Sequence, residues 1–304
     1  MNIIVTTYPF LESRAQCLEE VSFNEVKRKY SNLEHIAILK KTQPDIIIAG
    51  TENYTKDILD IVPNLKMIAR VGIGLDSVDL HECKKRGIIV TYTPDAPSNA
   101  VAELTLAQII NMLRGINTRI LSWNRYIGRE IRFSSIGIIG IGRIGTLVFQ
   151  ELSSFFPKNM LIYDIEPGKM YNLIGGIPST KEEILRQCDI ITIHIPLNES
   201  NKNYITTNEL ELMKPNACLL NMSRGGIINE KDIYQWLVSH PLFSVAIDTF
   251  EKEPYNGDLI KCKNAYLTPH LGSCTEMSRK RMEEEAVEDV LNFMNSSSFK
   301  NRVV

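Results

Sequence analysis

The feature that most constrains the fold is a set of glycines, Gly140, Gly142 and Gly145, which directly follows the apolar segment 135–139. This spacing predicts a strand, a tight turn and the start of a helix. In such a turn the first glycine allows a sharp reversal, the second lets the backbone approach a pyrophosphate, and the third lets the helix lie close to the strand. The N–H groups at the helix start would form the anion site. We therefore predict a dinucleotide-binding turn, with a purely structural glycine turn as the alternative.

A second apolar segment, residues 160–163, supports the dinucleotide hypothesis because Asp164 follows it directly. A carboxylate about 20 residues beyond such a turn accepts hydrogen bonds from the adenine ribose. The same carboxylate would repel the extra phosphate of NADP. The cofactor predicted is therefore NAD.

Strand-like and helix-like segments alternate along the chain, which predicts parallel, helix-covered sheets. Prolines 94 and 97 interrupt regular structure, and we place a domain hinge there because proline lacks an N–H and restricts the residue before it. The predicted fold is α/β with two doubly wound parallel-sheet domains. A Rossmann domain (residues 98–274) is inserted in a flavodoxin-like domain (residues 1–97 and 275–304). In the Rossmann domain we expect six strands, at residues 135–139, 160–163, 189–193, 217–221, 243–247 and 265–268.

Two long helices are expected at residues 99–113 and 275–295. The first is apolar nearly all round, which predicts burial against more than one neighbour and favours a subunit interface in a homodimer. The second is long enough to return to the first domain. Its charged triplets, residues 279–281 and 283–285, are interpreted as a solvated face.

Composition excludes several function classes. The 304-residue chain has a formal net charge of −2, which gives no general attraction to nucleic acid or anionic membranes, and no segment has transmembrane length. The six cysteines lack the paired spacing of zinc or redox motifs, so no metal site is expected. With no leader segment at the start, reduced thiols predict a cytoplasmic protein.

Three polar residues lie where strands of the Rossmann domain are expected to end, which is where ligands collect in open α/β sheets. Arg224 precedes two glycines and suits bidentate binding of a carboxylate, unless it is a surface arginine in a turn. Glu253 and His270 follow the next two strands. A lone histidine is often a packed or exposed bystander, so composition alone does not make His270 catalytic. His194, after the strand 189–193, is a second histidine candidate.

These residues belong to a larger set of motifs, at positions 70–79, 100–103, 137–145, 221–226, 248–254 and 268–272. In this order they resemble the D-isomer-specific 2-hydroxyacid dehydrogenases, and most closely their phosphoglycerate dehydrogenase-like branch. The resemblance covers nearly the whole chain. It implies an NAD-dependent oxidoreductase that interconverts a small D-2-hydroxy acid and its 2-keto acid, with 3-phosphoglycerate among the candidates.

The resemblance also implies roles for individual residues. Arg224, Glu253 and His270 would be catalytic: the arginine holds the carboxylate, the protonated histidine gives a proton to the carbonyl oxygen, and the glutamate stabilises the imidazolium. His194 would line the cofactor cleft through its backbone. The backbone at Val71 and Gly72 would contact substrate, which makes residues 1–97 and 275–304 the substrate domain. Besides the three glycines, the implied cofactor contacts are Arg143, Ile144, Asp164, Met222, Ser223, Asp248 and Ser273.

The chain departs from the family pattern in two informative places. The loop 49–54 contains no cation for a substrate phosphate; Arg70 and Lys56 could serve instead, but Glu52 argues against a dianionic group. Because the printed chain ends at Val304, we also expect no C-terminal regulatory domain.

Two other functions occur on folds of this kind. An NAD(H)-sensing corepressor on the same fold is the alternative, although no peptide-binding extension is visible. A formate dehydrogenase would be expected to carry glutamine where Glu253 stands.

Overall fold

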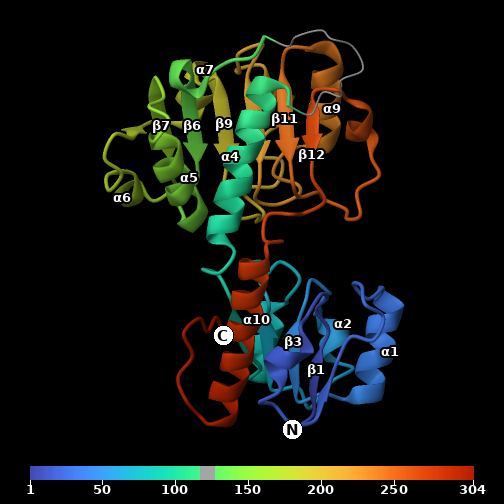
Figure 1. The fold of residues 1–304 in the computed structure, drawn as a ribbon. Coiled ribbons are helices and arrows are strands. Elements are labelled where there is room, and N and C mark those ends of the chain that lie inside the picture. The colour runs from blue at the N-terminus through green and yellow to red at the C-terminus, as the bar shows by residue number, and fades with distance from the viewer. Residues whose placement is uncertain (117–126) are drawn as a thin grey trace. The chain divides into compact units, whose positions relative to one another are not determined.

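The chain forms two compact α/β units in the computed structural model, which describes residues 1–116 and 127–304. Unit 1 comprises Met1–Pro97 and Thr275–Val304, and unit 2 comprises Ser98–Cys274. Figure 1 shows unit 1 in blue and cyan with its last helix in red, and unit 2 in green to orange. The chain thus leaves unit 1 after Pro97 and returns to it at Thr275.

Unit 1 is built on a five-stranded parallel sheet with the order β2-β1-β3-β4-β5. This is the flavodoxin-like order that the predicted fold class requires, and the prediction is confirmed. The short β2 was not predicted, because two residues carry no periodicity. The strands are β1 (Ile3–Val5), β2 (Val21–Ser22), β3 (Ile46–Ala49), β4 (Met67–Arg70) and β5 (Ile89–Tyr92). The helices are η1 (Glu12–Ala15), α1 (Asn32–Thr42), α2 (Lys56–Leu59), α3 (Leu80–Arg86) and α10 (Glu276–Met294).

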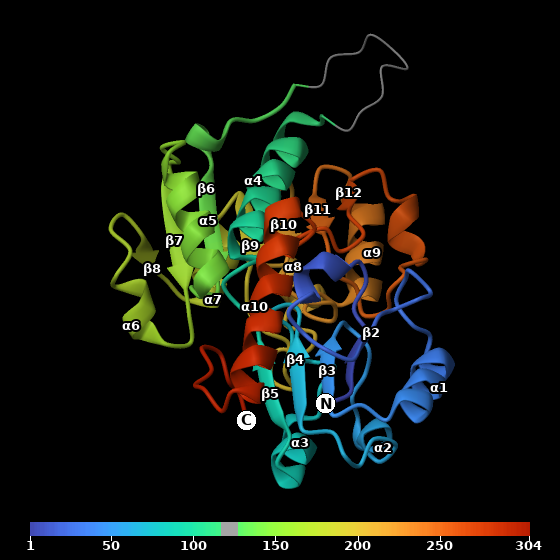
Figure 2. The same cartoon turned by 60° about the horizontal axis from the view of Figure 1, so that its bottom comes forward.

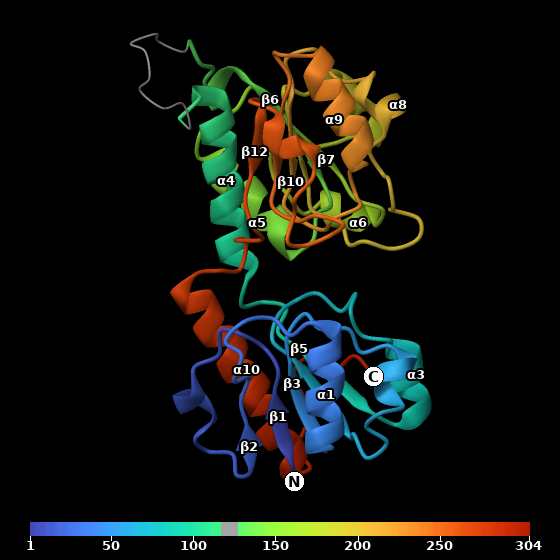
Figure 3. The ribbon, with the colours of Figure 1, turned by 90° about the vertical axis from the view of Figure 1, so that its right-hand side faces the viewer.

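Both faces of this sheet are covered, as the continuous apolar sequence of its strands requires. Successive side chains of β1 point to opposite faces: Ile3 and Val5 pack with α10, whereas Ile4 packs with α1, α2 and α3. Figure 3 shows α10 on one side of the sheet and α1 with α3 on the other. In Figure 2, α10 runs alongside β4 and β5, which it contacts.

One expectation for α10 is wrong. Glu283 was placed on a solvated face, but it is buried, with 2% of its surface exposed. Its carboxylate pairs with the guanidinium of Arg14 and, at 3.0 Å, with that of Arg279, and it accepts a hydrogen bond from the N–H of Leu11 at 3.0 Å. A carboxylate can be buried when charges and donors of this kind surround it. Glu283 therefore holds η1 against the helix.

Unit 2 contains a seven-stranded parallel sheet with the order β12-β11-β10-β9-β6-β7-β8. Six of its strands were predicted. The seventh, β8, is a two-residue edge strand containing Pro178, where the missing N–H costs no ladder bond. The strands are β6 (Ser135–Ile139), β7 (Asn159–Tyr163), β8 (Ile177–Pro178), β9 (Ile190–Ile193), β10 (Cys218–Asn221), β11 (Ser244–Ile247) and β12 (Ala265–Leu267).

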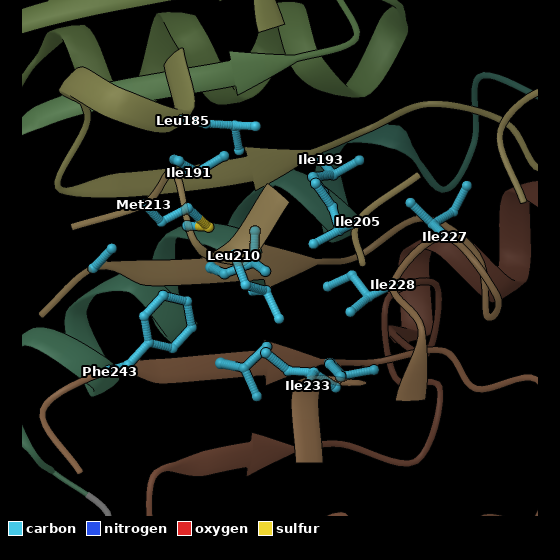
Figure 4. Close-up of a cluster of buried hydrophobic side chains, with 14 of the residues drawn as sticks. Leu185, Ile191, Ile193, Ile205, Leu210, Met213, Ile227, Ile228, Ile233 and Phe243 are labelled. Carbon is cyan, nitrogen blue, oxygen red and sulfur yellow. The ribbon is translucent and has the colours of Figure 1, made fainter. Parts of the chain in front are cut away.

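Helices cover both faces of this sheet as well. One hydrophobic cluster lies under α4 and α5, and another under α7, α8 and α9. Figure 4 shows the second cluster, in which Leu210, Ile233 and Phe243 pack toward the strands. The helices are α4 (Ser98–Arg114), η2 (Ile131–Phe133), α5 (Arg143–Ser153), α6 (Pro167–Met170), α7 (Lys181–Gln187), α8 (Thr207–Leu210), α9 (Glu230–Ser239) and η3 (Asp258–Lys261).

The long helix α4 packs against α5, β10 and β11 within unit 2. Much of its apolar surface is buried there, while Leu104, Leu106 and Ile110 stay half-buried at the edge of the cluster. Nowhere in the described ranges is a helix both long and apolar enough to cross a membrane. The same residues contain no group of three His, Cys, Asp or Glu side chains that could hold a metal ion.

Candidate active site

The glycine turn follows β6 at the point where the strand order of unit 2 reverses, between β6 and β9. Gly140 has a φ of +96°, and a Cβ there would lie 2.6 Å from the carbonyl oxygen of His194. A Cβ at Gly145 would lie 1.9 Å from the carbonyl oxygen of Gly140. At Gly142, the N-cap of α5, a Cβ would meet no atom within 4 Å. The backbone at Gly142 is therefore open, which fits the approach of a pyrophosphate.

Asp164 follows the neighbouring strand β7 and is tied to the glycine turn. Its carboxylate accepts hydrogen bonds from the N–H groups of Ile141 at 2.7 Å and Glu166 at 2.8 Å. The Nζ of Lys169 lies 3.8 Å from one carboxylate oxygen. The carboxylate is thus fixed beside the turn, and its predicted role in ribose binding stays a prediction.

Two further predicted cofactor contacts, Arg143 and Ile144, form the first turn of α5. Arg143 is exposed, and Ile144 is half-buried against the cluster under the helix. Both therefore lie at the positive end of the helix dipole, next to Gly142.

His194 follows β9, across the switch point from the glycine turn. Its Nε2 lies 2.9 Å from the hydroxyl oxygen of Thr192, and its Nδ1 is buried with no hydrogen-bond partner among the described residues. Burial lowers the pKa of His194 to about 3. The ring is therefore neutral at physiological pH and unsuited to donate a proton to a substrate.

Arg224 lies in the loop after β10. The side chain of Asn221 fixes this loop: its Oδ1 accepts from the N–H and hydroxyl of Ser223 at 3.1 and 2.8 Å, and its Nδ2 donates to the Arg224 carbonyl at 2.7 Å. The Nη1 of Arg224 donates to the Ser223 carbonyl at 2.7 Å. A Cβ at Gly225 would lie 2.0 Å from the carbonyl carbon of Phe250, so this loop packs directly on the loop after β11.

That neighbouring loop carries Glu253, and the structure brings Glu253 and His270 together. The Nδ1 of His270 lies 2.9 and 3.1 Å from the two carboxylate oxygens. The N–H of Phe250 donates to one of these oxygens at 3.1 Å, which orients the carboxylate. In the part of the chain that the structure describes, Nε2 of His270 has no protein partner. The second ring nitrogen is therefore the one that can face a substrate.

Asp248 holds the loop that carries His270. It is 1% exposed, and its carboxylate accepts from the hydroxyl of Thr268 at 2.6 Å and from the N–H groups of Leu271 at 2.7 Å and Gly272 at 2.8 Å. Its carbonyl accepts from the N–H of His270 at 2.9 Å. The carboxylate of Asp248 is thus engaged within the protein, and the contact of this residue with the cofactor stays a prediction.

Three other predicted cofactor contacts lie in the same loops. Met222 and Ser223 are buried directly after β10, and Ser273 is half-buried directly after Gly272. Sequence reasoning missed Asn221 and Thr268, which fix these loops. The signal for both was present, because each is a polar residue at the end of an apolar strand.

The predicted substrate contacts Val71 and Gly72 lie in unit 1, directly after β4. The N–H of Val71 donates to the Ala49 carbonyl at 3.0 Å, and that of Gly72 donates to the Thr93 hydroxyl at 2.8 Å. The guanidinium of Arg70 donates to the Val71 carbonyl and lies over Gly72. Both backbone donors are engaged here, so a role in substrate binding stays a prediction.

Comparison with known proteins adds independent findings. Residues 106–272 match the model of the family described as "D-isomer specific 2-hydroxyacid dehydrogenase, NAD binding domain". A glyoxylate reductase of Thermococcus litoralis is 32% identical over 82% of this chain and 80% of its own length. A D-3-phosphoglycerate dehydrogenase of Methanocaldococcus jannaschii is 33% identical over 91% of this chain. This chain spans about half the length of that relative, 54%.

A solved structure is similar to this chain over nearly its whole length. The crystal structure of D-lactate dehydrogenase from Aquifex aeolicus, complexed with NAD and lactic acid, superposes with a TM-score of 0.84 and 26% identity. The match covers 97% of this chain and 96% of that one. The similarity therefore extends over both units.

Proposed function

The chain belongs to the D-isomer-specific 2-hydroxyacid dehydrogenases, and from this premise we propose that it interconverts a small D-2-hydroxy acid and its 2-keto acid with NAD. The observation that carries the proposal is the pair formed by His270 and Glu253 in loops at the carboxyl edge of the NAD-binding sheet. Relatives named glyoxylate reductase, hydroxypyruvate reductase and phosphoglycerate dehydrogenase favour an enzyme over the corepressor alternative.

The residues of unit 2 fit the cofactor. NAD, when bound, accepts or delivers a hydride at its nicotinamide ring. In the proposal, the open backbone at Gly142 and the start of α5 bind the pyrophosphate, and Asp164 accepts from the adenine ribose. Arg143, Ile144 and the loops ending in Ser223 and Ser273 supply further contacts.

The charges of Arg224, His270 and Glu253 suit them to the roles in substrate binding and proton transfer. Hydrogen bonds from Asn221 to the Arg224 carbonyl and from Arg224 to the Ser223 carbonyl fix the loop that carries Arg224. The guanidinium of Arg224 binds the substrate carboxylate. His270, through Nε2, gives a proton to the carbonyl oxygen during reduction and takes one from the hydroxyl during oxidation. Glu253, at 2.9 Å from Nδ1, favours the imidazolium and fixes the orientation of the ring. Unit 1 is the proposed substrate domain, through the turn at Val71 and Gly72.

The proposal includes a homodimer and a cytoplasmic location. The half-buried Leu104, Leu106 and Ile110 of α4 support a subunit contact, and light scattering at micromolar concentration tests it: a monomeric mass would contradict it. The cysteines at 17, 83, 188, 218, 262 and 274 are all free thiols, as is usual for cytoplasmic proteins.

The test of the enzymatic proposal is NADH oxidation with glyoxylate, hydroxypyruvate, pyruvate and 3-phosphohydroxypyruvate. We expect turnover with at least one of them. His270→Ala should abolish that turnover while leaving NADH binding intact, measured by fluorescence titration. Full activity of His270→Ala, or no oxidation of NADH with any 2-keto acid by the wild type, would contradict the proposal.

A further inference from the structure

Unit 1 has its own topological switch point, where the strand order reverses between β1 and β3. In open α/β sheets, ligands bind outside the carboxyl ends of the strands at such a point. Here Thr6 and Thr7 follow β1, and Gly50 and Glu52 follow β3. The two threonines and the glutamate are buried polar residues, with at most 4% of their surfaces exposed. The chain thus gathers buried polar groups where a ligand is expected.

The carboxylate of Glu52 lies between these two loops. A Cβ at Gly50 would lie 2.6 Å from its Oε2 and 3.0 Å from the Cα of Thr7. The hydroxyl of Thr6 donates to Oε2 at 3.4 Å and lies 2.8 Å from the hydroxyl of Tyr54. Glycine at position 50 therefore leaves the space that the carboxylate occupies.

The carboxylate of Glu52 is buried, and opposing effects act on its pKa. Burial raises the pKa of Glu52. The backbone N–H groups of Glu52 and Tyr30, the positive charge of Lys29 and the Thr6 hydroxyl oppose that rise without cancelling it. Across the described residues, no lysine, arginine or histidine forms an ion pair with Glu52. The carboxylate is thus held at the switch point by hydrogen bonds, without an ion-pair partner among the described residues.

The turn predicted to contact the substrate lies on the adjacent strand. Val71 and Gly72 follow β4, which pairs with β3, and the N–H of Val71 donates to the carbonyl of Ala49 at the end of β3. The guanidinium of Arg70, the last residue of β4, donates to the Val71 carbonyl. A substrate held at this turn would therefore lie next to the loop after β3 that carries Glu52.

We propose that Glu52 sets the substrate class of this enzyme: a 2-keto acid whose only negative charge is its carboxylate, and not one whose side chain ends in a phosphate. The inference rests on the proposed function. A phosphate would bring about two more negative charges toward a buried carboxylate, where the low dielectric strengthens repulsion. A hydroxyl or hydrogen in its place meets no such repulsion, and a hydroxyl can donate to the carboxylate.

The test compares kcat/KM for hydroxypyruvate and for 3-phosphohydroxypyruvate, which differ only in the phosphate. In the wild type we expect hydroxypyruvate to be favoured at least about tenfold. Glu52→Gln keeps the shape of the side chain and removes its charge. It should lower the ratio of kcat/KM for hydroxypyruvate to kcat/KM for 3-phosphohydroxypyruvate at least about fivefold, chiefly by raising kcat/KM for the phosphorylated substrate. Glu82→Gln is the matched control, because Glu82 is also buried in unit 1 but pairs with Arg86 on α3.

The outcomes separate the inference from the function on which it rests. Preference of the wild type for the phosphorylated substrate, an unchanged ratio in Glu52→Gln, or an equal change in Glu82→Gln would each overturn the role of Glu52. Absence of turnover with every 2-keto acid would instead overturn the proposed function. If Glu52→Gln does not fold, inhibition of the wild type by D-glycerate and by 3-phosphoglycerate supplies the comparison. Tighter inhibition by 3-phosphoglycerate would overturn the inference.

Discussion

Two glycines of the same turn should respond to alanine in opposite ways. A Cβ at Gly145 would lie 1.9 Å from the backbone oxygen of Gly140, about 1.5 Å closer than an ordinary contact, and both partners are backbone. Forcing α5 away from β6 should cost about 3 kcal/mol, the upper end for overpacking. Gly142 has extended backbone angles, φ −90° and ψ −158°, and open space around its Cβ. Gly142→Ala should therefore leave the unfolding free energy within about 1 kcal/mol of the wild type.

Cofactor affinity should separate the same two variants. In Gly142→Ala the new methyl group occupies the space into which a pyrophosphate must come, so NADH should bind at least about tenfold more weakly, or about 1.4 kcal/mol. Urea unfolding of the cofactor-free protein and fluorescence titration with NADH measure the two quantities. The reasoning is refuted if Gly142→Ala binds NADH as tightly as the wild type, or if Gly145→Ala unfolds at the wild-type urea concentration.

Three further predictions concern single side chains. Asp164→Ser should narrow the preference for NADH over NADPH, because the carboxylate repels the additional phosphate; a wild type equally active with NADPH would contradict this. Arg224→Lys should lower kcat/KM for keto acids at least about a hundredfold, since an ammonium cannot reproduce the paired N–H geometry; near-normal kcat/KM would mean that another cation binds the carboxylate. Burial lowers the pKa of His35 to about 4 in the folded protein, whereas the unfolded chain keeps the ordinary value of about 6.5. As pH falls from about 6.5 to 4, the unfolded state is protonated first, so about 3 kcal/mol of the unfolding free energy should be lost. Urea unfolding across that range should show a flatter profile for His35→Asn, and an unchanged slope would count against the buried neutral ring.

The parts of the fold set by local sequence were predictable. The glycine turn and Asp164 could be identified because close packing and backbone reversal require glycine at fixed spacings, and the ribose-binding position lies at a fixed distance along the chain. The strand order also follows from alternating strands and helices. These features depend on neighbours within about 30 residues, the length of one βαβ unit.

The parts set by distant partners were not predictable. Glu283 has the sequence context of a solvated helix face, yet its partner Arg14 comes from the other end of the chain. The donors that hold the carboxylate of Asp248, at Leu271 and Gly272, lie more than 20 residues further on and reach it only through the fold. Pairing of His270 with Glu253 was inferred from family resemblance, because spacing alone does not bring two loops together.

The central claim is that His270 transfers the proton and that Glu253 stabilises the positive charge of the His270 imidazolium. One measurement tests this claim most directly. The pH profile of kcat/KM for keto-acid reduction is recorded for the wild type and for Glu253→Gln. Reduction needs protonated His270, so its rate should fall as pH rises, and hydroxy-acid oxidation should show the opposite trend. Glu253→Gln removes the carboxylate that lies 2.9 Å from Nδ1 and stabilises the imidazolium, so it should lower kcat/KM for reduction across the profile. A kcat/KM in Glu253→Gln equal to that of the wild type at every pH would contradict this claim.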